Sequence, residues 1–440
     1  MKKPIVAIVG RPNVGKSTLF NKMVGKRRAV IEDIPGITRD RLYDEAKYDD
    51  KRFIVIDTGG IHTEPSKDMD SEVREQALVA VEEADILIMM MDAESGLLPA
   101  DMELINLLRR YSKKTFYAVN KIDGINKEKN LLTDFYAAGI DIFPVSALNG
   151  YGYHDFMEKV TELIPDFDEE ESEYPRISIL GRPNVGKSTL VNSLLGKNRM
   201  IVSDVPGTTR DAVDSICSYY KKNYVLVDTA GIRRKGKMAE TFEKYSFMRT
   251  VRNVENCDVV LMVLDASEGV VELDLKIAGL IFESGRGAII LLNKWDLVDK
   301  EEMSLKKMEA EVYQKMWFMR HVPILTVSAL NRQRVTNLFS LVDEVIAESS
   351  KRISTNQLNL FIKKVVKLKE PPMHAGKRVK IKYITQIKTK PPGFIIFTNN
   401  KEGMKPQYIR FIEKHLRESF GFKGVPLSIF VRQSEVKKRP

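Results

Sequence analysis

Cysteine, histidine and long apolar runs are all scarce in this sequence. Its 440 residues include two cysteines, Cys217 and Cys257, which cannot form a disulfide framework and are expected to be reduced core residues. No apolar run is long enough to cross a bilayer, and the N-terminal MKKPIVAIVG has neither a signal-peptide pattern nor a glycine for acylation. The five histidines show no metal-ligand spacing. These absences favour a cytoplasmic protein that does not bind membranes.

Positive charge is concentrated in the last fifth of the chain. Residues 351–440 hold 22 Lys and Arg against 5 acidic residues, whereas the first 350 residues hold 48 against 55. This separation predicts a C-terminal module that meets a polyanion, with nucleic acid favoured over an anionic membrane surface. Lys380, Lys382 and Lys388 suit phosphate contacts, which carry no base selectivity and no DNA specificity. The plain alternative is a well-solvated basic surface.

A set of short strings occurs twice in the same order. GRPNVGKSTL at 10–19 returns unchanged at 181–190. The other pairs are PGITRD (35–40) with PGTTRD (206–211), DTGG (57–60) with DTAG (228–231), NKID (120–123) with NKWD (293–296), and VSALN at 145–149 and 327–331. The offset grows from 171 to 182 along the chain, which places insertions in the second copy between its motifs. The repeat predicts a duplicated domain.

Each copy alternates apolar runs with amphipathic segments. The runs are unbroken and rich in β-branched residues, as in parallel strands that helices cover on both faces. They span 5–10, 53–57, 84–92, 115–120 and 142–147 in the first copy, and 177–181, 224–228, 257–265, 287–293 and 323–329 in the second. The motifs follow the carboxyl ends of these runs, where open α/β sheets bind ligands. We expect an α/β fold with domains at 1–164 and 176–348, an acidic linker at 165–175, and a basic module at 349–440.

The basic module has its own pattern. Ser354 to Gln357 forms a capping box before an apolar stripe of Leu358, Phe361, Val365 and Leu368. A strand that alternates Val379, Ile381 and Tyr383 with lysines follows, then a strand at 394–397, a helix from Pro406 to just before Gly421, and a strand at 427–431. This α-β-β-α-β order predicts helices packed on a small sheet. GFKG (421–424) matches the GXXG string of RNA-binding KH domains, but its place after a helix favours a helix-ending turn.

The glycine-rich strings have the spacing of a phosphate-binding loop. Gly10-x4-Gly15-Lys16-Ser17 follows a strand and opens a helix, so backbone N–H groups can surround a β-phosphate. Lysine then bridges the β- and γ-phosphates, and serine offers a hydroxyl to Mg²⁺. The phosphate-site residues expected from the two copies are Gly10, Asn13, Gly15, Lys16, Ser17 and Thr18, and Gly181, Asn184, Gly186, Lys187, Ser188 and Thr189.

Two aspartates end buried strands, where an unpartnered carboxylate would be unstable. We expect Asp57 and Asp228 to contact Mg²⁺ through a water molecule. Gly60 and Gly231 then let a backbone N–H approach the γ-phosphate. Loop residues Thr38 and Thr209 are the expected second hydroxyl ligands of Mg²⁺, although loop threonines also serve simply as turn formers. Lys16, Lys187, Thr38, Thr209, Gly60 and Gly231 are the predicted catalytic groups.

The choice of base follows from the NKxD strings. A carboxylate at Asp123 or Asp296 can accept from N1–H and the 2-amino group of guanine, whereas adenine would leave it facing a lone pair. Asn120 and Asn293 are expected to tie this loop to the phosphate loop and the base. Lys121 and Lys294 are expected along the purine face. Backbone N–H groups of Ser146, Ala147, Ser328 and Ala329 are expected at the guanine oxygen.

The order GRPNVGKS, T, DTGG or DTAG, NKxD and SAL is that of the P-loop GTPases. Two such units followed by a basic α/β module closely resemble the bacterial EngA (Der) family, over nearly the whole chain. The resemblance implies two sites for GTP or GDP with Mg²⁺, a KH-like C-terminal domain associated with RNA, and GTP hydrolysis in assembly of the large ribosomal subunit. We expect a monomer.

The residue after each DxxG string is Ile61 or Ile232, where Ras-type switches carry a water-orienting glutamine. An apolar residue there also fits the resemblance. We therefore expect backbone groups to hold the attacking water and a potassium ion to stabilise the developing charge, with Asn13 and Asn184 as its ligands, as in related potassium-activated GTPases. The alternative role for these asparagines is to shape the loop by hydrogen bonds. His62 lacks a partner that would make it a catalytic base.

Two functions of different class remain. In the first, the GTP cycle gates docking on ribosomal RNA. In the second, the protein is an RNA-binding assembly scaffold in which nucleotide mainly sets domain packing. The complete Lys, Ser, Thr and Asp sets in both copies favour the first, because a purely structural site need not keep Mg²⁺ ligands.

Overall fold

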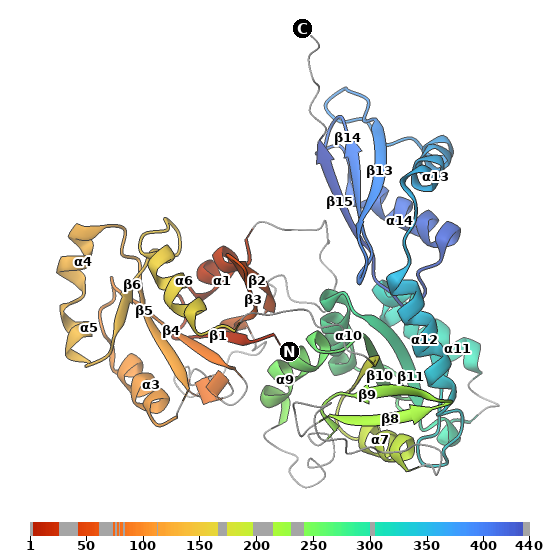
Figure 1. Cartoon of the computed structure of the whole chain (residues 1–440), viewed down its shortest axis with the longest axis horizontal. Helices are drawn as coiled ribbons and strands as arrows, with labels where there is room; N and C mark the ends of the chain where they lie inside the picture. Colours follow the sequence, from red (N-terminus) through yellow and green to blue (C-terminus); the bar gives the residue numbers. More distant parts are fainter. Residues whose placement is uncertain are drawn as a thin grey trace. The chain divides into compact units, whose positions relative to one another are not determined.

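The computed structural model describes residues 3–25, 43–60, 84–111, 113–165, 174–196, 214–229, 242–299 and 304–433, with isolated helical positions between 74 and 81. The chain forms two compact units. One is built mainly on the first copy of the repeat, and the other holds the second sheet and the C-terminal module (Figure 1). Within the described part of the chain, no helix has both the length and the apolar character needed to cross a membrane.

The first unit contains a six-stranded sheet with the order β2-β3-β1-β4-β5-β6. All neighbouring strands run parallel except β2, which pairs antiparallel with β3. The strands are β1 (Ile5–Val9), β2 (Tyr43–Tyr48), β3 (Lys51–Asp57), β4 (Ile86–Asp92), β5 (Lys114–Asn120) and β6 (Ile142–Pro144). The helices are α1 (Lys16–Val24), the short η1 (Thr58–Gly60), α3 (Pro99–Arg109), α4 (Ile125–Leu131), α5 (Thr133–Ala137) and α6 (Tyr153–Glu162). The predicted α/β fold is confirmed.

The central parallel strands are buried on both faces, as is typical of parallel sheets. Every residue of β1 and β4 is buried, so these strands need cover on both faces. Helices α1 and α6 supply one cover, with Leu19, Phe20, Phe156 and Val160 packed in the same cluster as alternate residues of the strands. Strand β2, which was not predicted from the sequence, lies at the edge of the sheet and its exposed residues are polar.

The second sheet repeats this plan with the order β12-β11-β10-β7-β9-β8. Its strands are β7 (Arg176–Leu180), β8 (Ser215–Tyr219), β9 (Lys222–Leu226), β10 (Val259–Asp265), β11 (Gly287–Asn293) and β12 (Ile324–Thr326). The helices are α7 (Lys187–Leu195), α9 (Phe242–Glu255), α10 (Glu272–Ser284), η3 (Trp295–Leu297), α11 (Leu305–Lys315), η4 (Trp317–Met319) and α12 (Asn337–Ser350). Helices α7 and α12 share one apolar cluster with the sheet, and α10 and α11 share the other.

The two cysteines lie on opposite faces of this second sheet. Cys217 belongs to the cluster with α7 and α12, and Cys257 belongs to the other. Both are free and buried, and burial raises the pKa of each thiol to about 12. They are therefore reduced core residues, as expected from the sequence.

The C-terminal module has the predicted α-β-β-α-β order. Its elements are α13 (Thr355–Leu368), β13 (Ile381–Lys388), β14 (Gly393–Thr398), α14 (Pro406–Phe420) and β15 (Ser428–Gln433). The sheet order is β13-β14-β15, with the first pair antiparallel and the second parallel. Ser354 caps α13 by accepting from the backbone N–H of Gln357, as the capping box predicts.

Two details of the module differ from the predicted pattern. Leu368 ends the expected apolar stripe but is 70% exposed, because it is the last residue of α13. Tyr383 was expected to share a face with Ile381, yet the strand register shifts between these residues. This bulge adds a residue, Lys382, and turns Tyr383 away from the helices.

The GFKG string ends a helix, as its sequence position suggested. Gly421 follows α14 with φ of 90°, and Phe422 is fully buried. The backbone N–H of Gly424 donates to the oxygen of His321 (2.7 Å), and its oxygen accepts from the N–H of Ala288 (2.8 Å). The string thus docks the module against the second sheet, so it is not the open loop that clamps nucleotides in KH domains.

Candidate nucleotide-binding sites

The two phosphate-loop strings lie between the first strand and first helix of their domains, with α1 beginning at Lys16 and α7 at Lys187. Gly15 has φ of 98°, and a Cβ there would lie 2.2 Å from Asn120 Nδ2. Gly186 repeats this arrangement, with φ of 94° and 2.3 Å to Asn293 Nδ2. Glycine is required at both positions by conformation and by the close approach of the asparagine.

Each phosphate-loop lysine folds back on its own loop. Lys16 Nζ donates to the oxygens of Gly10 (2.8 Å) and Arg11 (2.7 Å), and Lys187 Nζ donates to those of Gly181 and Arg182 (2.7 Å each). Burial lowers the pKa of Lys16, an effect that Asp57 opposes and Arg11 reinforces. A desolvated ammonium inside a ring of backbone groups is suited to an anionic ligand.

In the first copy, two oxygen atoms that could ligate a metal ion lie close together beside this loop. Ser17 Oγ donates to Asp57 Oδ2 at 2.6 Å, and the N–H of Gly59 donates to Asp57 Oδ1 at 2.9 Å. Asp57 is 4% exposed at the end of β3. A hydroxyl and a nearly buried carboxylate oxygen fit the ligand chemistry of Mg²⁺.

The second copy differs at the matching aspartate. Asp228 has φ of 56°, its N–H donates to Asp214 Oδ1 (3.0 Å), and its Oδ2 accepts from Asn253 Nδ2 (3.1 Å) on α9. The two sites are therefore not identical. Gly60 ends η1. The predicted residues Thr38, Thr209 and Gly231, together with Ile61, Ile232 and His62, lie outside the described residues.

One asparagine in each copy joins the phosphate loop to the SAL loop. Asn120 Nδ2 donates to the oxygen of Val14 (2.8 Å), and its Oδ1 accepts from the N–H of Ala147 (2.9 Å). Asn293 makes the same two bonds, to Val185 and Ala329, at the same distances. Both asparagines are buried. The phosphate and base ends of each site are thus held in a fixed relation by one side chain.

The backbone N–H groups of the two SAL loops already have hydrogen-bond acceptors. The N–H of Ser146 donates to the oxygen of Tyr151 (2.8 Å), and that of Ser328 to the oxygen of Gln333 (3.2 Å). Together with the Asn120 and Asn293 bonds, they engage all four N–H groups that the sequence analysis assigned to the guanine oxygen. A guanine oxygen at this place must share or replace an existing acceptor.

The NKxD carboxylate of the first copy accepts hydrogen bonds from three donors. Asp123 accepts from Lys127 Nζ (2.9 Å), Ser146 Oγ (2.9 Å) and Asn149 Nδ2 (3.0 Å). The bonds from Lys127 and Ser146 lower the pKa of Asp123. The exposed group is therefore an ionised acceptor. Asp296 occupies the matching position in the second copy, also exposed, within η3.

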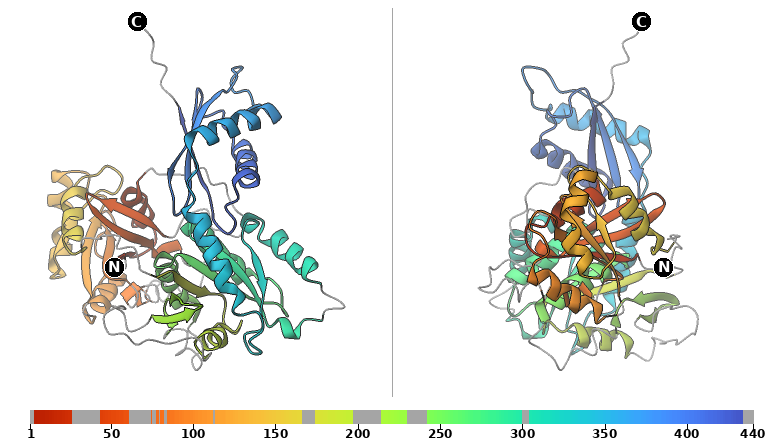
Figure 2. Two further views of the ribbon diagram at one scale, coloured as in Figure 1. Left: turned by 45° about the vertical axis from the view of Figure 1, so that its right-hand side comes forward. Right: turned by 90° about the vertical axis from the view of Figure 1, so that its left-hand side faces the viewer.

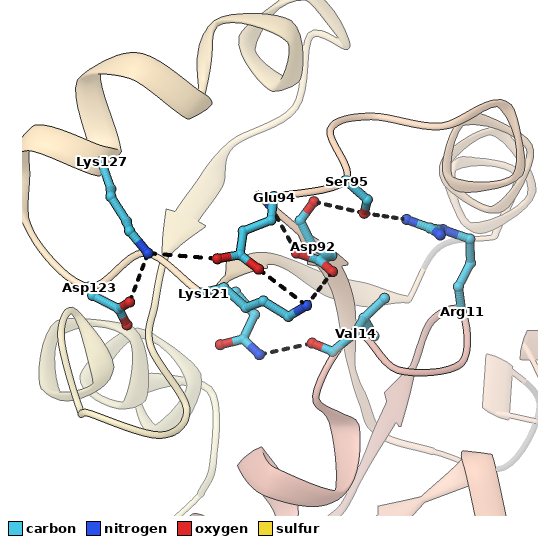
Figure 3. Close-up of polar contacts among 9 residues, drawn as sticks. Arg11, Val14, Asp92, Glu94, Ser95, Lys121, Asp123 and Lys127 are labelled. Atoms are coloured by element: carbon cyan, nitrogen blue, oxygen red, sulfur yellow. Dashed lines mark hydrogen bonds and ion pairs between the residues drawn. The ribbon is translucent and has the colours of Figure 1, made fainter.

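The NKxD lysines are held by carboxylates that were not predicted from the sequence. Lys121 Nζ lies 2.6 Å from Asp92 Oδ2, at the end of β4, and 3.7 Å from Glu94 (Figure 3). Lys294 Nζ lies 2.6 Å from Asp265 at the end of β10. The Asp92 bond raises the pKa of Lys121. The signal was present as a further repeated string, DAESG at 92–96 and DASEG at 265–269.

A second missed contact fixes the phosphate-loop arginine. Arg11 Nε donates to Asp101 Oδ1 (2.8 Å) and its Nη2 to Ser95 Oγ (3.2 Å), a contact visible at the right of Figure 3. Asp101 is fully buried and also accepts from the N–H of Leu98 at the start of α3. The phosphate loop is thereby tied to a helix as well as to the base loop.

Comparisons with known proteins agree with this layout. A family model described as "50S ribosome-binding GTPase" matches residues 5–121 and 176–294, and one described as "KH-domain-like of EngA bacterial GTPase enzymes, C-terminal" matches 352–432. The proteins named GTPase Der from Geotalea daltonii and Geobacter sp. (strain M21) are 46% and 47% identical, covering 99% of this chain and 100% and 99% of theirs. Aquifex aeolicus Era bound to GDP.AlF4- is 25% identical, with a TM-score of 0.31, covering 60% of this chain and 95% of that one.

Proposed function

Because the chain belongs to the EngA (Der) family of GTPases, we propose that it is a GTP-gated factor in assembly of the large (50S) ribosomal subunit. The protein hydrolyses GTP to GDP and phosphate, and both its GTPase domains match a ribosome-binding type. The large-subunit role draws on that family description and on the basic C-terminal module. We propose that its domains span 1–164, 176–348 and 349–440. We also propose that the protein is a cytoplasmic monomer.

The observation that carries a nucleotide function is the asparagine bridge, which has the same two bond lengths in both copies. A triphosphate and a base are recognised by separate loops, so a site for both needs those loops at a fixed spacing. Asn120 and Asn293 supply this spacing before any ligand arrives. Such preorganisation lowers the ordering cost of binding.

In the proposed mechanism, Lys16 and Lys187 exchange their loop carbonyl bonds for the β- and γ-phosphates. Ser17 and Asp57 would hold Mg²⁺ in the first site, with Ser188 and Asp228 in the second and Thr38 and Thr209 as the further ligands. The ion supplies neutralisation of charge on the phosphates. The backbone N–H groups of Gly60 and Gly231 would face the γ-phosphate, and backbone groups would orient the attacking water.

At the base, Asp123 and Asp296 would accept from N1–H and the 2-amino group of guanine. Lys121 and Lys294 would lie along the purine face, held by their aspartate partners. The N–H of Ala147 or Ala329 would be shared between the guanine oxygen and the bridging asparagine. This assignment keeps the bridge in place while the base is read.

We assign a potassium site to Asn13 and Asn184, which are exposed in the phosphate loops with φ of 64° and 65°. The amide oxygen is a ligand type that suits a hard cation. Turnover is expected to rise at least about tenfold when sodium is replaced by potassium, since a positive group at the transferring phosphate is worth about 10³-fold in related enzymes. Asn13→Ala and Asn184→Ala would abolish the rise at their own sites. Equal turnover in the two salts rules the ion out.

The function is tested by co-sedimentation with separated ribosomal subunits, with a non-hydrolysable GTP analogue or GDP, at two salt concentrations. Binding to large subunits only with the analogue is the expected result. Lys16→Ala and Lys187→Ala, compared for turnover and subunit binding, separate a switch from a scaffold. A scaffold would lose turnover and keep binding, and a switch would lose both. Equal binding with the analogue and GDP contradicts gating.

A further inference from the structure

The C-terminal sheet has one face that neither of the module's helices covers. Helices α13 and α14 pack against Ile384, Phe394, Ile396, Ile429 and Val431, and Figures 1 and 2 show both helices on the same side. Because side chains alternate along a strand, the residues between these point to the opposite face. That face carries Tyr383, which is exposed, Phe397 and Phe430, which are half-buried, and Ile395, which is buried among them.

The strand register places an aromatic pair and a cation in one row across this face. Tyr383 pairs with Phe397 on β14, and Phe397 pairs with Arg432 on β15. The Tyr383 and Phe397 rings are stacked, with centroids 4.3 Å apart and planes 16° from parallel. Tyr383 is 40% exposed. The next row is Thr385, Ile395 and Phe430.

The bulge at Lys382 creates this arrangement. Without the extra residue, Tyr383 would lie with Ile381 on the helix-covered face. A scattered exposed aromatic is ordinary on a protein surface. Here the backbone departs from regular pairing and, in doing so, stacks one ring on another beside exposed cations, which is the composition of a base-stacking surface.

The charge of this face is one-sided. The three strands, IKYITQIK, GFIIFT and SIFVRQ, contain three cations and no acidic residue. Lys382 and Arg432 are exposed, as is Lys380 just before β13. An anionic partner with flat apolar groups complements such a surface. Single-stranded RNA has both features, whereas paired RNA hides its base faces in the helical stack.

In this chain, the GXXG loop through which KH domains usually bind RNA is already engaged in contacts with the second GTPase domain. The N–H of Gly424 donates to the oxygen of His321, which precedes β12, and its oxygen accepts from the N–H of Ala288 in β11, while Phe422 is buried. Lys423 Nζ is paired with Glu344 of α12 at 3.0 Å. The GXXG string therefore serves domain docking, and a nucleotide contact by this module has to use another surface.

We infer that the uncovered sheet face binds single-stranded RNA, with an unpaired base stacked on the Tyr383–Phe397 pair and phosphates contacted by Lys382 and Arg432. This inference deepens the proposed ribosomal function and rests on it for the source of the RNA. The partner class is an unpaired RNA segment, recognised by stacking and charge and not by base identity.

The test uses the full chain with fluorescein-labelled 12-nucleotide oligouridine and a 12-base-pair RNA duplex, followed by fluorescence anisotropy. Tyr383→Ala is expected to weaken single-strand binding about fivefold or more, the value of one stacked base. Tyr383→Trp keeps the stacking surface and is expected to retain binding. Tyr111→Ala removes a tyrosine of the first unit with the same 40% exposure as Tyr383 and serves as the matched control. Lys382→Ala should weaken the binding of both RNA probes and reduce the dependence of that binding on salt concentration.

Large-subunit co-sedimentation of the same variants separates the two proposals. Single-strand binding that needs Tyr383, without subunit binding, supports the surface and overturns the ribosomal function. Wild-type protein that binds subunits but not oligouridine, or binds it equally after Tyr383→Ala, overturns the surface and leaves the ribosomal function intact. Loss of subunit binding in Tyr383→Ala with unchanged RNA affinity identifies a ribosomal protein as the contact and also overturns it.

Discussion

Lys121 and Asp92 form a 2.6 Å ion pair between the base loop and the end of β4, and Lys294 and Asp265 repeat it at 2.6 Å in the second copy. Both lysines have left-handed backbones, with φ of 72° and 59°. Each lysine is thus fixed twice, by the turn that carries it and by a carboxylate from the neighbouring strand. This double restraint would preorganise its methylene stem for the proposed contact with the purine face.

Asp92→Asn is expected to weaken GDP binding at the first site about five- to twentyfold, because the ammonium loses its charged partner and its position. The measurement is titration of a fluorescent GDP analogue in a chain whose second site is disabled by Lys187→Ala. Glu94→Gln is the control, since Glu94 lies 3.7 Å from the same ammonium and is mostly exposed. Equal affinity in Asp92→Asn and wild type would show that the pair positions nothing.

Asp123→Asn is expected to exchange the base that the first site accepts. An amide can donate to the 2-carbonyl of xanthine, whereas it places a donor against the 2-amino group of guanine. GTP affinity should fall about 30-fold or more, and XTP affinity should rise. Competition between GTP and XTP in the Lys187→Ala background measures both. Asp134→Asn, on exposed α5, is the matched control. Unchanged preference contradicts base reading by Asp123.

Gly15→Ala is expected to disable the first site and destabilise the first unit by about 1–3 kcal/mol. The new Cβ would lie 2.2 Å from Asn120 Nδ2 and break the bridge between the loops. Gly25→Ala is a close control, because Gly25 also has a left-handed backbone (φ 73°) but a Cβ there meets nothing within 4 Å. Thermal unfolding with and without GDP compares the two. Similar losses in both would assign the effect to backbone strain alone.

Much of the architecture followed from the sequence, since fully buried strands leave long apolar runs and phosphate loops have strict spacing. Strands β2 and β8 were missed because YDEAKY and SICSY are half-exposed and interrupt the apolar pattern. Asp92 and Asp265 were missed for a different reason. They open the repeated strings DAESG and DASEG, but the repeat alone does not show that each carboxylate contacts a lysine from a distant loop.

The face of Tyr383 could not be read from alternation either. Residues 379, 381 and 383 keep a period of two, so the pattern predicts one shared face. The bulge depends on how β14 pairs with β13, a non-local contact that the β13 sequence does not encode by itself. Long-range pairing therefore decides which face of the sheet Tyr383 lies on.

The second unit is expected to lose stability in mild acid through His321. Burial lowers the pKa of His321 well below its usual value, and the nearby Arg417 guanidinium lowers it further. Between that depressed pKa and about 6.5, the unfolded chain binds a proton that the folded chain does not. Stability is therefore complete above about pH 6.5 and falls below it, by up to about 1.4 kcal/mol per pH unit.

Both tryptophans of the chain, Trp295 and Trp317, lie in the second unit, so their fluorescence follows its unfolding alone. Urea unfolding at pH 5.0, 6.0 and 7.5 should show the loss in wild type, and His321→Gln should flatten it. His154→Gln, in the first unit, should leave the pH dependence unchanged. A His321→Gln chain with the wild-type slope would place the acid sensitivity elsewhere. The outcome matters for the whole unit, because the His321 backbone oxygen also receives the Gly424 N–H that docks the C-terminal module on the second sheet.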